Sequence, residues 1–173
     1  MQAVNRVNLL RPKFVVSVGD LIEGYTENRQ QLEAEWNEFL GFIDKLDMRF
    51  FFVAGNHDLS NAVMHKLWRD KFGPEWYSFD YKKVHFVCLN SEDPVSRLGS
   101  EQLEWLAEDL RQHNDARWTL VFVHKPLWMY AEREIAAGNE DSTGWKQVET
   151  LLGNRPHTVF AGHFHTYTKY ERN

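Results

Sequence analysis

Four hydrophobic runs in this sequence lead directly into residues that can bind metals or transfer protons. The runs are followed by Asp20, by Asn56-His57-Asp58, by His124 and by His163-Phe164-His165. Carboxylate, amide and imidazole groups together suit ions such as Fe, Mn or Zn, and not the thiolate coordination of structural zinc. A carboxylate can bridge two such ions, which together can hold a phosphoryl group and lower the pKa of a shared water. The residue types therefore indicate a two-metal site suited to phosphoryl chemistry.

Each residue also has an ordinary explanation when it is taken alone. An Asp after a strand, such as Asp20, is typical of a turn or a cap, and Asn56-His57-Asp58 could form a tight turn into a helix. His124 could be a hydrogen-bonded histidine at a strand end. His163 and His165 are harder to explain in this way, because two closely spaced imidazoles can reach one small volume. The joint arrangement favours the metal site.

Alternating strands and helices are expected to position these residues. Short runs rich in Val and Phe predict buried strands at residues 14–18, 50–54, 84–89, 119–123 and 158–161. Apolar residues at helical spacing predict helices at residues 27–46, 61–72, 100–113, where Ser100 can cap, and 144–152. Residues 77–81 are predicted to form an antiparallel hairpin with the strand that follows them. The pattern indicates an α/β layered domain with a largely parallel sheet, in which ligands bind beyond the carboxyl ends of the strands.

Length, charge and cysteine content narrow the class of protein. A chain of 173 residues with 43% hydrophobic content fits one domain, residues 1–173. The net charge of −5 argues against a protein that holds nucleic acid through its phosphates. The single cysteine, Cys88, cannot form an internal disulfide and is read as a small buried hydrophobe. No apolar stretch reaches the length of a membrane span, and we expect a cytoplasmic location.

The ordered set of motifs resembles the calcineurin-like metallophosphoesterase family. The motifs are Gly19-Asp20, Gly55-Asn56-His57-Asp58, His124 and Gly162-His163-Phe164-His165, and the resemblance extends over residues 13–165. It implies an α/β/α sandwich, with a β-sandwich flanked by helices. It also implies hydrolysis of a small-molecule or protein phosphate ester by a metal-activated water.

The resemblance assigns the metal ligands position by position. Asp20 would bridge both ions, Asn56, His124 and His163 would complete the second site, and His165 would serve the first site. The ions implied are two divalent or trivalent ions of Mn, Fe or Zn.

The resemblance also implies a proton donor to the leaving group, His57, with Asp58 accepting its other ring N–H and holding the imidazole in place. Glu23 and Tyr25 either line the pocket or belong to an ordinary turn. The remaining histidines match no motif and are expected to be structural or exposed: His65, His85, His113 and His157.

One departure from the family pattern concerns the first metal site. Members open with a strand ending in Asp-x-His, whereas this sequence has no Asp before Asp20 and no His before His57. Either the chain is truncated, with its first strand missing, or it is a natural variant with a degenerate site; the intact downstream motifs favour truncation. With only Asp20 and His165 left for the first site, we expect one firmly held ion and poor stability of the isolated chain.

The sequence leaves the substrate open between phosphomonoester and phosphodiester. The polar connection at residues 129–142 is expected to be a long loop, and residues 128–142 are the candidate for specificity. A non-catalytic module that keeps one metal ion is the alternative to an enzyme. A nucleotide-binding switch is disfavoured, because no Gly-rich phosphate loop with Lys-Ser or Lys-Thr follows any strand.

Overall fold

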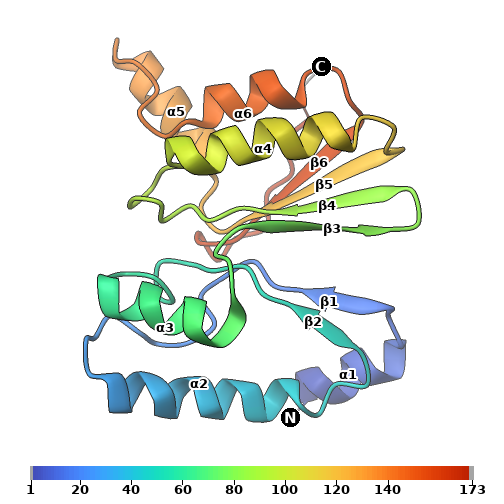
Figure 1. Cartoon of the computed structure of the whole chain (residues 1–173), viewed down its shortest axis with the longest axis vertical. Helices are drawn as coiled ribbons and strands as arrows, with labels where there is room; N and C mark the ends of the chain where they lie inside the picture. The colour runs from blue at the N-terminus through green and yellow to red at the C-terminus, as the bar shows by residue number, and fades with distance from the viewer. Residues whose placement is uncertain (1, 172–173) are drawn as a thin grey trace.

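Two β-sheets face each other between two layers of helices in the computed structural model, which describes residues 2–171 (Figure 1). One sheet consists of β1 (Phe14–Val16) and β2 (Arg49–Phe51), and the other of β3 (Tyr77–Tyr81), β4 (Val84–Cys88), β5 (Trp118–Val123) and β6 (His157–Ala161). The outer layers contain α1 (Gln2–Leu10), α2 (Arg29–Ile43) and α3 (Ala62–Phe72) on one side, and α4 (Ser100–Gln112), α5 (Leu127–Ala136) and α6 (Trp145–Leu152) on the other. The expected sandwich of sheets flanked by helices is confirmed.

Parallel pairing places the strand ends that matter at common edges. β1 pairs in parallel with β2, with Val15 opposite Phe50. β4, β5 and β6 are also parallel neighbours, with Val121 opposite both Val87 and Val159. β3 runs antiparallel to β4, which confirms the predicted hairpin. Polar residues that follow parallel strands therefore emerge at one edge of each sheet.

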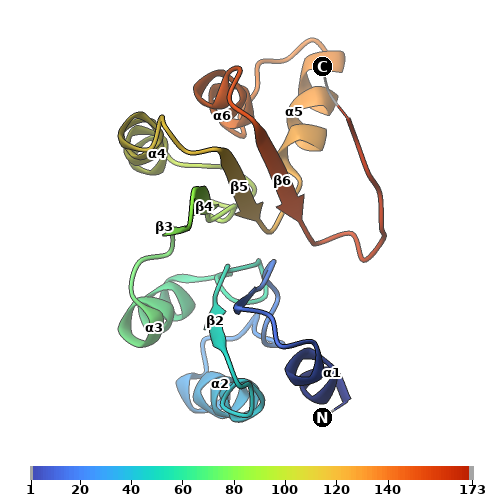
Figure 2. The ribbon, with the colours of Figure 1, turned by 90° about the vertical axis from the view of Figure 1, so that its right-hand side faces the viewer.

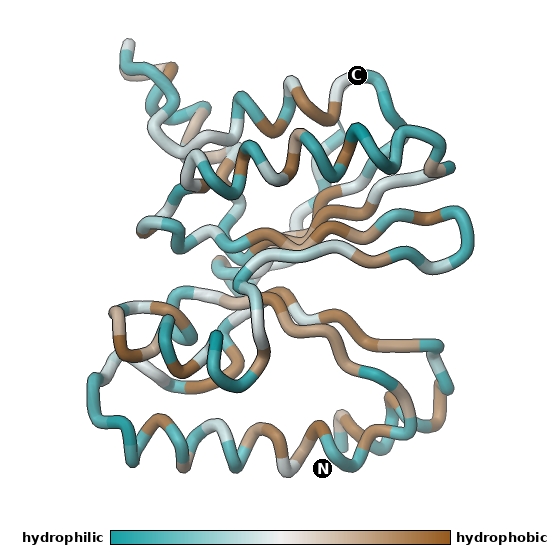
Figure 3. The backbone as a smooth tube through the Cα atoms, in the orientation of Figure 1, coloured by the Kyte–Doolittle hydropathy of each residue, from teal (hydrophilic) through white to brown (hydrophobic). Residues whose placement is uncertain are grey.

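The two sheets share an aromatic cluster, and Figure 3 shows hydrophobic residues along the strands of both sheets. The ring of Phe51 stacks on that of Phe79 at 3.7 Å between centroids, across the two sheets. Phe14 meets Phe86 edge to face at 5.2 Å. Cys88 lies buried in the same cluster, as the sequence predicts. The aromatic contacts between the sheets fix the distance between them, and hence the distance between the loops that follow their strands.

The helices bury their apolar faces against the outer sides of the sheets. In α2 and α3, Trp36 and Trp68 are each 1% exposed and their rings lie 5.7 Å apart. Asn28 and Asn61 cap these two helices, since each side chain accepts a backbone N–H in the first turn. The predicted cap at Ser100 is wrong, because α4 is preceded by Gly99 and has no side-chain cap hydrogen bond.

The segment at residues 129–142 is not the continuous loop that the sequence suggested. Its first part belongs to α5, in which Leu127 and Ala131 are fully buried one helical turn apart. Glu132, Arg133 and Glu134 obscured this spacing because they fill the exposed face of the helix. None of the described helices is long and apolar enough to cross a membrane.

Candidate metal centre

Loops from both sheets meet between the two layers and bring the predicted residues together. Figure 2 shows the ends of β5 and β6 close to the loops that follow β1 and β2. Asp20 follows β1, Asn56 follows β2, His124 follows β5 directly, and His163 follows β6. Asp20, His124 and His163 offer ligand atoms that all lie within 4.8 Å of one another. The predicted second metal site is thus assembled from four separate parts of the chain.

The Nε2 atom of His124 is the centre of this arrangement. It lies 3.1 Å from Oδ2 of Asp20, 3.0 Å from Oδ1 of Asn56 and 3.2 Å from Nδ1 of His163. The other ring nitrogen, Nδ1, lies 2.7 Å from the carbonyl oxygen of Val18, which can only accept a hydrogen bond. A neutral His124 therefore carries its proton on Nδ1, and Nε2 presents a lone pair.

This lone pair faces other electron-rich atoms, which makes the donor set suited to a cation. The carboxylate of Asp20 has no proton to offer. The amide of Asn56 is also oriented, because its Nδ2 donates to the hydroxyl of Tyr25 at 2.5 Å and its Oδ1 is left facing His124. Carboxylate, amide oxygen and two imidazoles converging on one point form a favourable site for a borderline transition-metal ion.

Two glycines permit the close approach of these loops. A Cβ atom on Gly55 would collide with the carboxylate and the backbone nitrogen of Asp20, and one on Gly19 would lie 2.6 Å from Nδ1 of His124. Gly19 has φ 90°, which L-residues rarely adopt. Asp20 and His163 themselves have φ values of 56° and 71°, so the site holds two non-glycine residues in the left-handed region.

The charge state of the two ligands fits metal binding. Burial alone would raise the pKa of Asp20, but the neighbouring His124 imidazole and the hydrogen bond from the backbone N–H of His57 outweigh it and leave the pKa below its ordinary value. Burial lowers the pKa of His163, and the neighbouring His124 ring and the ammonium of Lys125 add to this effect. Both shifts favour the deprotonated forms that coordinate metals.

His57 lies beside this cluster, but the prediction that Asp58 accepts its ring N–H is wrong. Its Nδ1 lies 2.7 Å from the backbone carbonyl oxygen of Glu23, so this carbonyl, and not Asp58, accepts the ring N–H. The ring of Tyr25 packs edge to face on the imidazole at 4.6 Å. Glu23 and Tyr25 therefore contact the site residues, the first through its backbone and the second through its side chain.

Asp58 instead holds the loops in place. Its side chain is 1% exposed and accepts hydrogen bonds from the backbone N–H groups of Gly55, Leu21 and Ile22, at 2.7, 2.9 and 3.2 Å. Burial raises the pKa of this carboxyl to about 6, an effect that the three N–H groups partly offset. These hydrogen bonds connect the loop after β2 to the segment that follows Asp20. The sequence motif alone cannot distinguish this role of Asp58 from a contact with His57.

His165 is a predicted ligand that does not belong to this close cluster. It is exposed, with φ 53°, and is not part of the group of atoms within 4.8 Å that contains Asp20, His124 and His163. It lies close enough to His163 for its charge to contribute to the lowered pKa of that residue. The structure therefore brings together the predicted second site and leaves His165 at its edge.

A buried ion pair next to the cluster was missed by the sequence analysis. Nζ of Lys125 lies 2.9 Å from Oε2 of Glu92, and their side chains are only 7% and 2% exposed. Ser91 and Ser96 contribute further hydrogen bonds to this pair. A signal was available, since Asn90, Ser91 and Glu92 follow one residue beyond the end of β4, much as the other site residues follow their strands.

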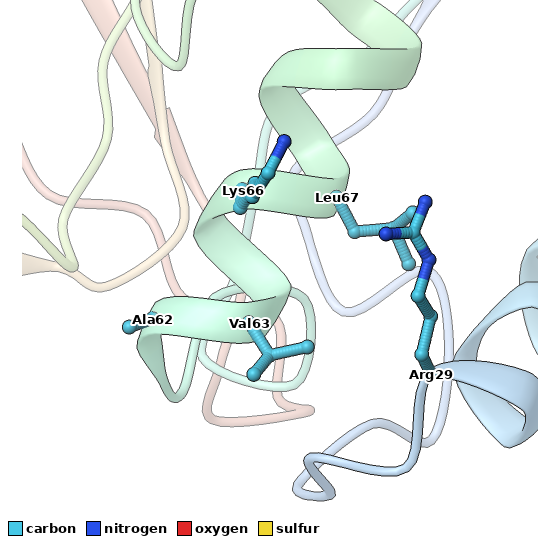
Figure 4. A pocket seen from close by; sticks show the side chains of 5 residues that line it. All are labelled: Arg29, Ala62, Val63, Lys66 and Leu67. Atoms are coloured by element: carbon cyan, nitrogen blue, oxygen red, sulfur yellow. The ribbon is translucent and has the colours of Figure 1, made fainter.

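A surface pocket of about 320 Å³ lies elsewhere, between the start of α2 and α3 (Figure 4). Its lining consists of Arg29, Ala62, Val63, Lys66 and Leu67. This lining offers two cations and aliphatic groups but no metal ligand. The histidine cluster, and not this pocket, is therefore the candidate functional site.

Comparison with known proteins identifies the family to which this geometry corresponds. The model of the calcineurin-like phosphoesterase family matches residues 1–167. The chain belongs to this family.

Two curated relatives are phosphatases. The chain is 29% identical over 179 residues to the serine/threonine-protein phosphatase CPPED1 of Mus musculus, a match that covers 95% of this chain and 57% of that protein. It is 34% identical over 158 residues to the probable purple acid phosphatase 20 of Arabidopsis thaliana, covering 79% of this chain and 36% of that protein. The chain thus spans 57% of the length of the first relative and 36% of the length of the second.

Solved structures show the same fold. A purple acid phosphatase from yellow lupin (Lupinus luteus) seeds matches with a TM-score of 0.68 and 19% identity, over 95% of this chain and 32% of that one. A dimetal phosphatase from Danio rerio matches with a TM-score of 0.64 and 17% identity, over 95% of this chain and 70% of that one.

Proposed function

We propose that this chain carries a site for metal-dependent hydrolysis of phosphate esters. The observation that carries the proposal is the convergence of Asp20, Asn56 and His163 on the Nε2 atom of His124. When bound there, metal ions supply charge neutralisation for the phosphoryl group and activate a water molecule as the nucleophile. The family membership supports the same reaction.

His57 is the group we assign to the proton that the leaving alkoxide requires. Its Nδ1–H donates to the carbonyl of Glu23, which leaves Nε2 as the ring atom that can hold and release a proton. The edge of Tyr25 packs against the ring and restricts its rotation. Both contacts position the imidazole before the substrate arrives, which is what general acid catalysis needs.

The ions we propose are Mn, Fe or Zn, because the donors are a carboxylate, an amide oxygen and imidazoles. The second site has four candidate ligands, whereas the first site has only Asp20 and His165, and His165 lies outside the close group. This chain should therefore hold one ion firmly. The substrate is a small-molecule or protein phosphate ester, and no nucleic acid is expected at a net charge of −5.

The segment at residues 128–142, which contains most of α5, remains our candidate for substrate selection. The ring of Tyr130 stacks with that of Phe164 at 6.3 Å, and Phe164 lies between His163 and His165. The first turn of α5 thus touches the loop that carries the metal ligands. The contact between Tyr130 and Phe164 supports the proposal that side chains on this turn select the ester group of the substrate.

The proposal is tested by measuring turnover of an aryl phosphate and its diester with added Mn²⁺, in the wild type and in the His57→Ala variant. We expect His57→Ala to lose turnover while keeping its metal, because the ring is not one of the clustered ligands. His157→Ala is the matched control, since that exposed histidine lies outside the site. Loss of metal together with turnover in His57→Ala would contradict the role assigned to it.

A second candidate function is a non-catalytic module that keeps one ion. It is favoured by the small number of ligands for the first metal, Asp20 and His165. The same experiment separates the two functions. Firm metal binding without turnover of either substrate would support the module.

A further inference from the structure

A second cluster of histidine and aspartate side chains lies at the opposite end of the large sheet. Asp80 and His85 are directly opposed in the β3–β4 hairpin, and His113 ends α4 above them. In Figure 1 this hairpin lies at the right-hand edge, away from the loops of the candidate metal centre. His85 pairs with Thr119 near the start of β5, whereas His124 follows its end, a separation of roughly 16 Å at about 3.3 Å per residue.

The cluster is tightly connected. Nδ1 of His85 lies 2.9 Å from Oδ1 of Asp80, and Nε2 of His113 lies 3.4 Å from Oδ2 of the same carboxylate. The two imidazole rings stack at 4.0 Å with 14° between their planes. Asp80, His85 and His113 offer ligand atoms that all lie within 4.8 Å of one another. One carboxylate thus faces one nitrogen of each ring.

Asp109 fixes the opposite nitrogen of both rings. Its Oδ2 lies 2.8 Å from Nε2 of His85, and its backbone carbonyl oxygen lies 2.7 Å from Nδ1 of His113. Ser78 donates a further hydrogen bond to the Asp109 carboxylate and holds it in place. Carboxylates and carbonyls accept these ring N–H groups, so a ring that carries no second proton presents a lone pair on the atom that faces Asp80.

We infer that Asp80, His85 and His113 form a second binding site for a divalent transition-metal ion, of which Zn²⁺ is the best match. Two imidazoles and one carboxylate are ligands that such ions prefer. The hydrogen bonds from the far ring nitrogens to Asp109 are the outer contacts that orient metal-binding histidines. One divalent ion would also balance the negative charges of Asp80 and Asp109.

The geometry needs only a local adjustment. Ligands at about 2.0–2.1 Å from Zn²⁺ are roughly 3.4 Å from one another in a tetrahedron, close to the distances between Asp80 and the two rings. Because the rings stack nearly parallel, one ring must tilt for the ion to lie in both planes. His113 can do so, since its side chain is 30% exposed at the helix end, whereas His85 is fully buried.

The bound ion would join the β3–β4 hairpin to the end of α4. The half-exposed Asp80 covers the fully buried His85, so an ion can enter from solvent when this carboxylate moves. Three protein ligands leave one position for water. We assign the ion a stabilising role, in which it clamps the end of α4 to the β3–β4 hairpin.

The test is to count Zn²⁺ by elemental analysis after dialysis and to record Co²⁺ absorption in the wild type, Asp80→Asn and His113→Gln. Both substitutions are at partly exposed side chains, so the chain should remain folded, as circular dichroism would verify. We expect each variant to bind one Zn²⁺ fewer per chain. The Co²⁺ absorption that comes from this site should also be missing from each variant. Asp109→Asn should weaken the affinity by about 10- to 100-fold.

Two controls separate this site from the candidate metal centre. His157→Gln changes an exposed histidine outside both clusters and should leave the Zn²⁺ content unchanged. His163→Ala removes a ligand of the candidate metal centre, and this variant should still lose one Zn²⁺ when Asp80→Asn is added. Equal Zn²⁺ content and equal Co²⁺ spectra with and without Asp80→Asn would overturn the inference and leave the cluster a network of ionic hydrogen bonds only.

Discussion

The Nδ1 atom of His124 lies 2.7 Å from the carbonyl oxygen of Val18. Val18 precedes His124 by 106 positions and follows β1, a strand of the other sheet. This one contact has two effects. It joins the two sheets at the candidate metal centre, and it fixes the tautomer that leaves Nε2 free to bind a metal.

Two substitutions at His124 should separate these effects. In His124→Asn the side-chain amide nitrogen can replace Nδ1 as donor to Val18, whereas His124→Ala has no donor. We expect both variants to lose metal, but only His124→Ala to leave the partly buried carbonyl without this donor, at a cost of about 1 kcal/mol. Metal analysis and urea unfolding measure the two effects. Equal stability of the two variants would show that the contact is not needed to join the sheets.

A methyl group at Gly55 should disrupt the same site. In Gly55→Ala the added Cβ would collide with Asp20, so we expect weaker metal binding and lower stability. Gly41→Ala is the matched control, because Gly41 lies in the last turn of α2 and a Cβ there meets nothing within 4 Å. That variant should be at least as stable as the wild type, because Ala has a higher helix propensity than Gly. Both free energies of unfolding can be measured with urea, and normal metal binding by Gly55→Ala would be inconsistent with the collision.

Breaking the buried ion pair should destabilise the chain far more than breaking an exposed one. Lys125→Met leaves Glu92 buried without its cation and should cost about 3–5 kcal/mol. Lys146→Met removes an exposed pair with Glu149 and should cost about 1 kcal/mol or less. Chemical denaturation of both variants gives the comparison. Similar losses would mean that water screens the buried pair as well as the exposed one.

The thiol of Cys88 should be unreactive in the folded chain. It is 1% exposed, and burial raises the pKa of the Cys88 thiol to about 12. At pH 8 the folded protein therefore contains almost no thiolate, which is the form that attacks disulfide reagents. We expect slow reaction with an aromatic disulfide reagent under native conditions and rapid reaction in urea. Fast native labelling would indicate that the aromatic cluster between the sheets opens.

Much of the fold could be predicted from sequence because its strands are short, apolar and bounded by polar residues. All five predicted strands and the β3–β4 hairpin are present, and four predicted helices lie where the apolar spacing placed them. The predictions failed for a helix whose apolar spacing is interrupted by charged residues and for one helix cap. In α5, charged residues on the exposed face masked the spacing of Leu127 and Ala131, and Gly99 replaces Ser100 as the cap because the cap depends on local backbone angles.

The candidate site was predictable in its membership but not in its contacts. Asp20, Asn56, His124 and His163 converge as the motif order suggested. Sequence could not show that Glu23 accepts the ring N–H of His57, because the acceptor is a backbone atom, which carries no residue type. Nor could it show the cluster around His85, where a strand pair and a helix end bring together residues that match no motif.

The order in which the site residues occur along the chain has a consequence for synthesis. The candidate ligands come from the beginning, the first third and the last part of the sequence, and His163 follows β6, the last of the described strands along the chain. Contacts between residues so far apart close late in folding. A nascent chain emerging from the ribosome would therefore bind its ion only after β6 has joined the sheet, so that metal capture would report the pairing of β6 with β5.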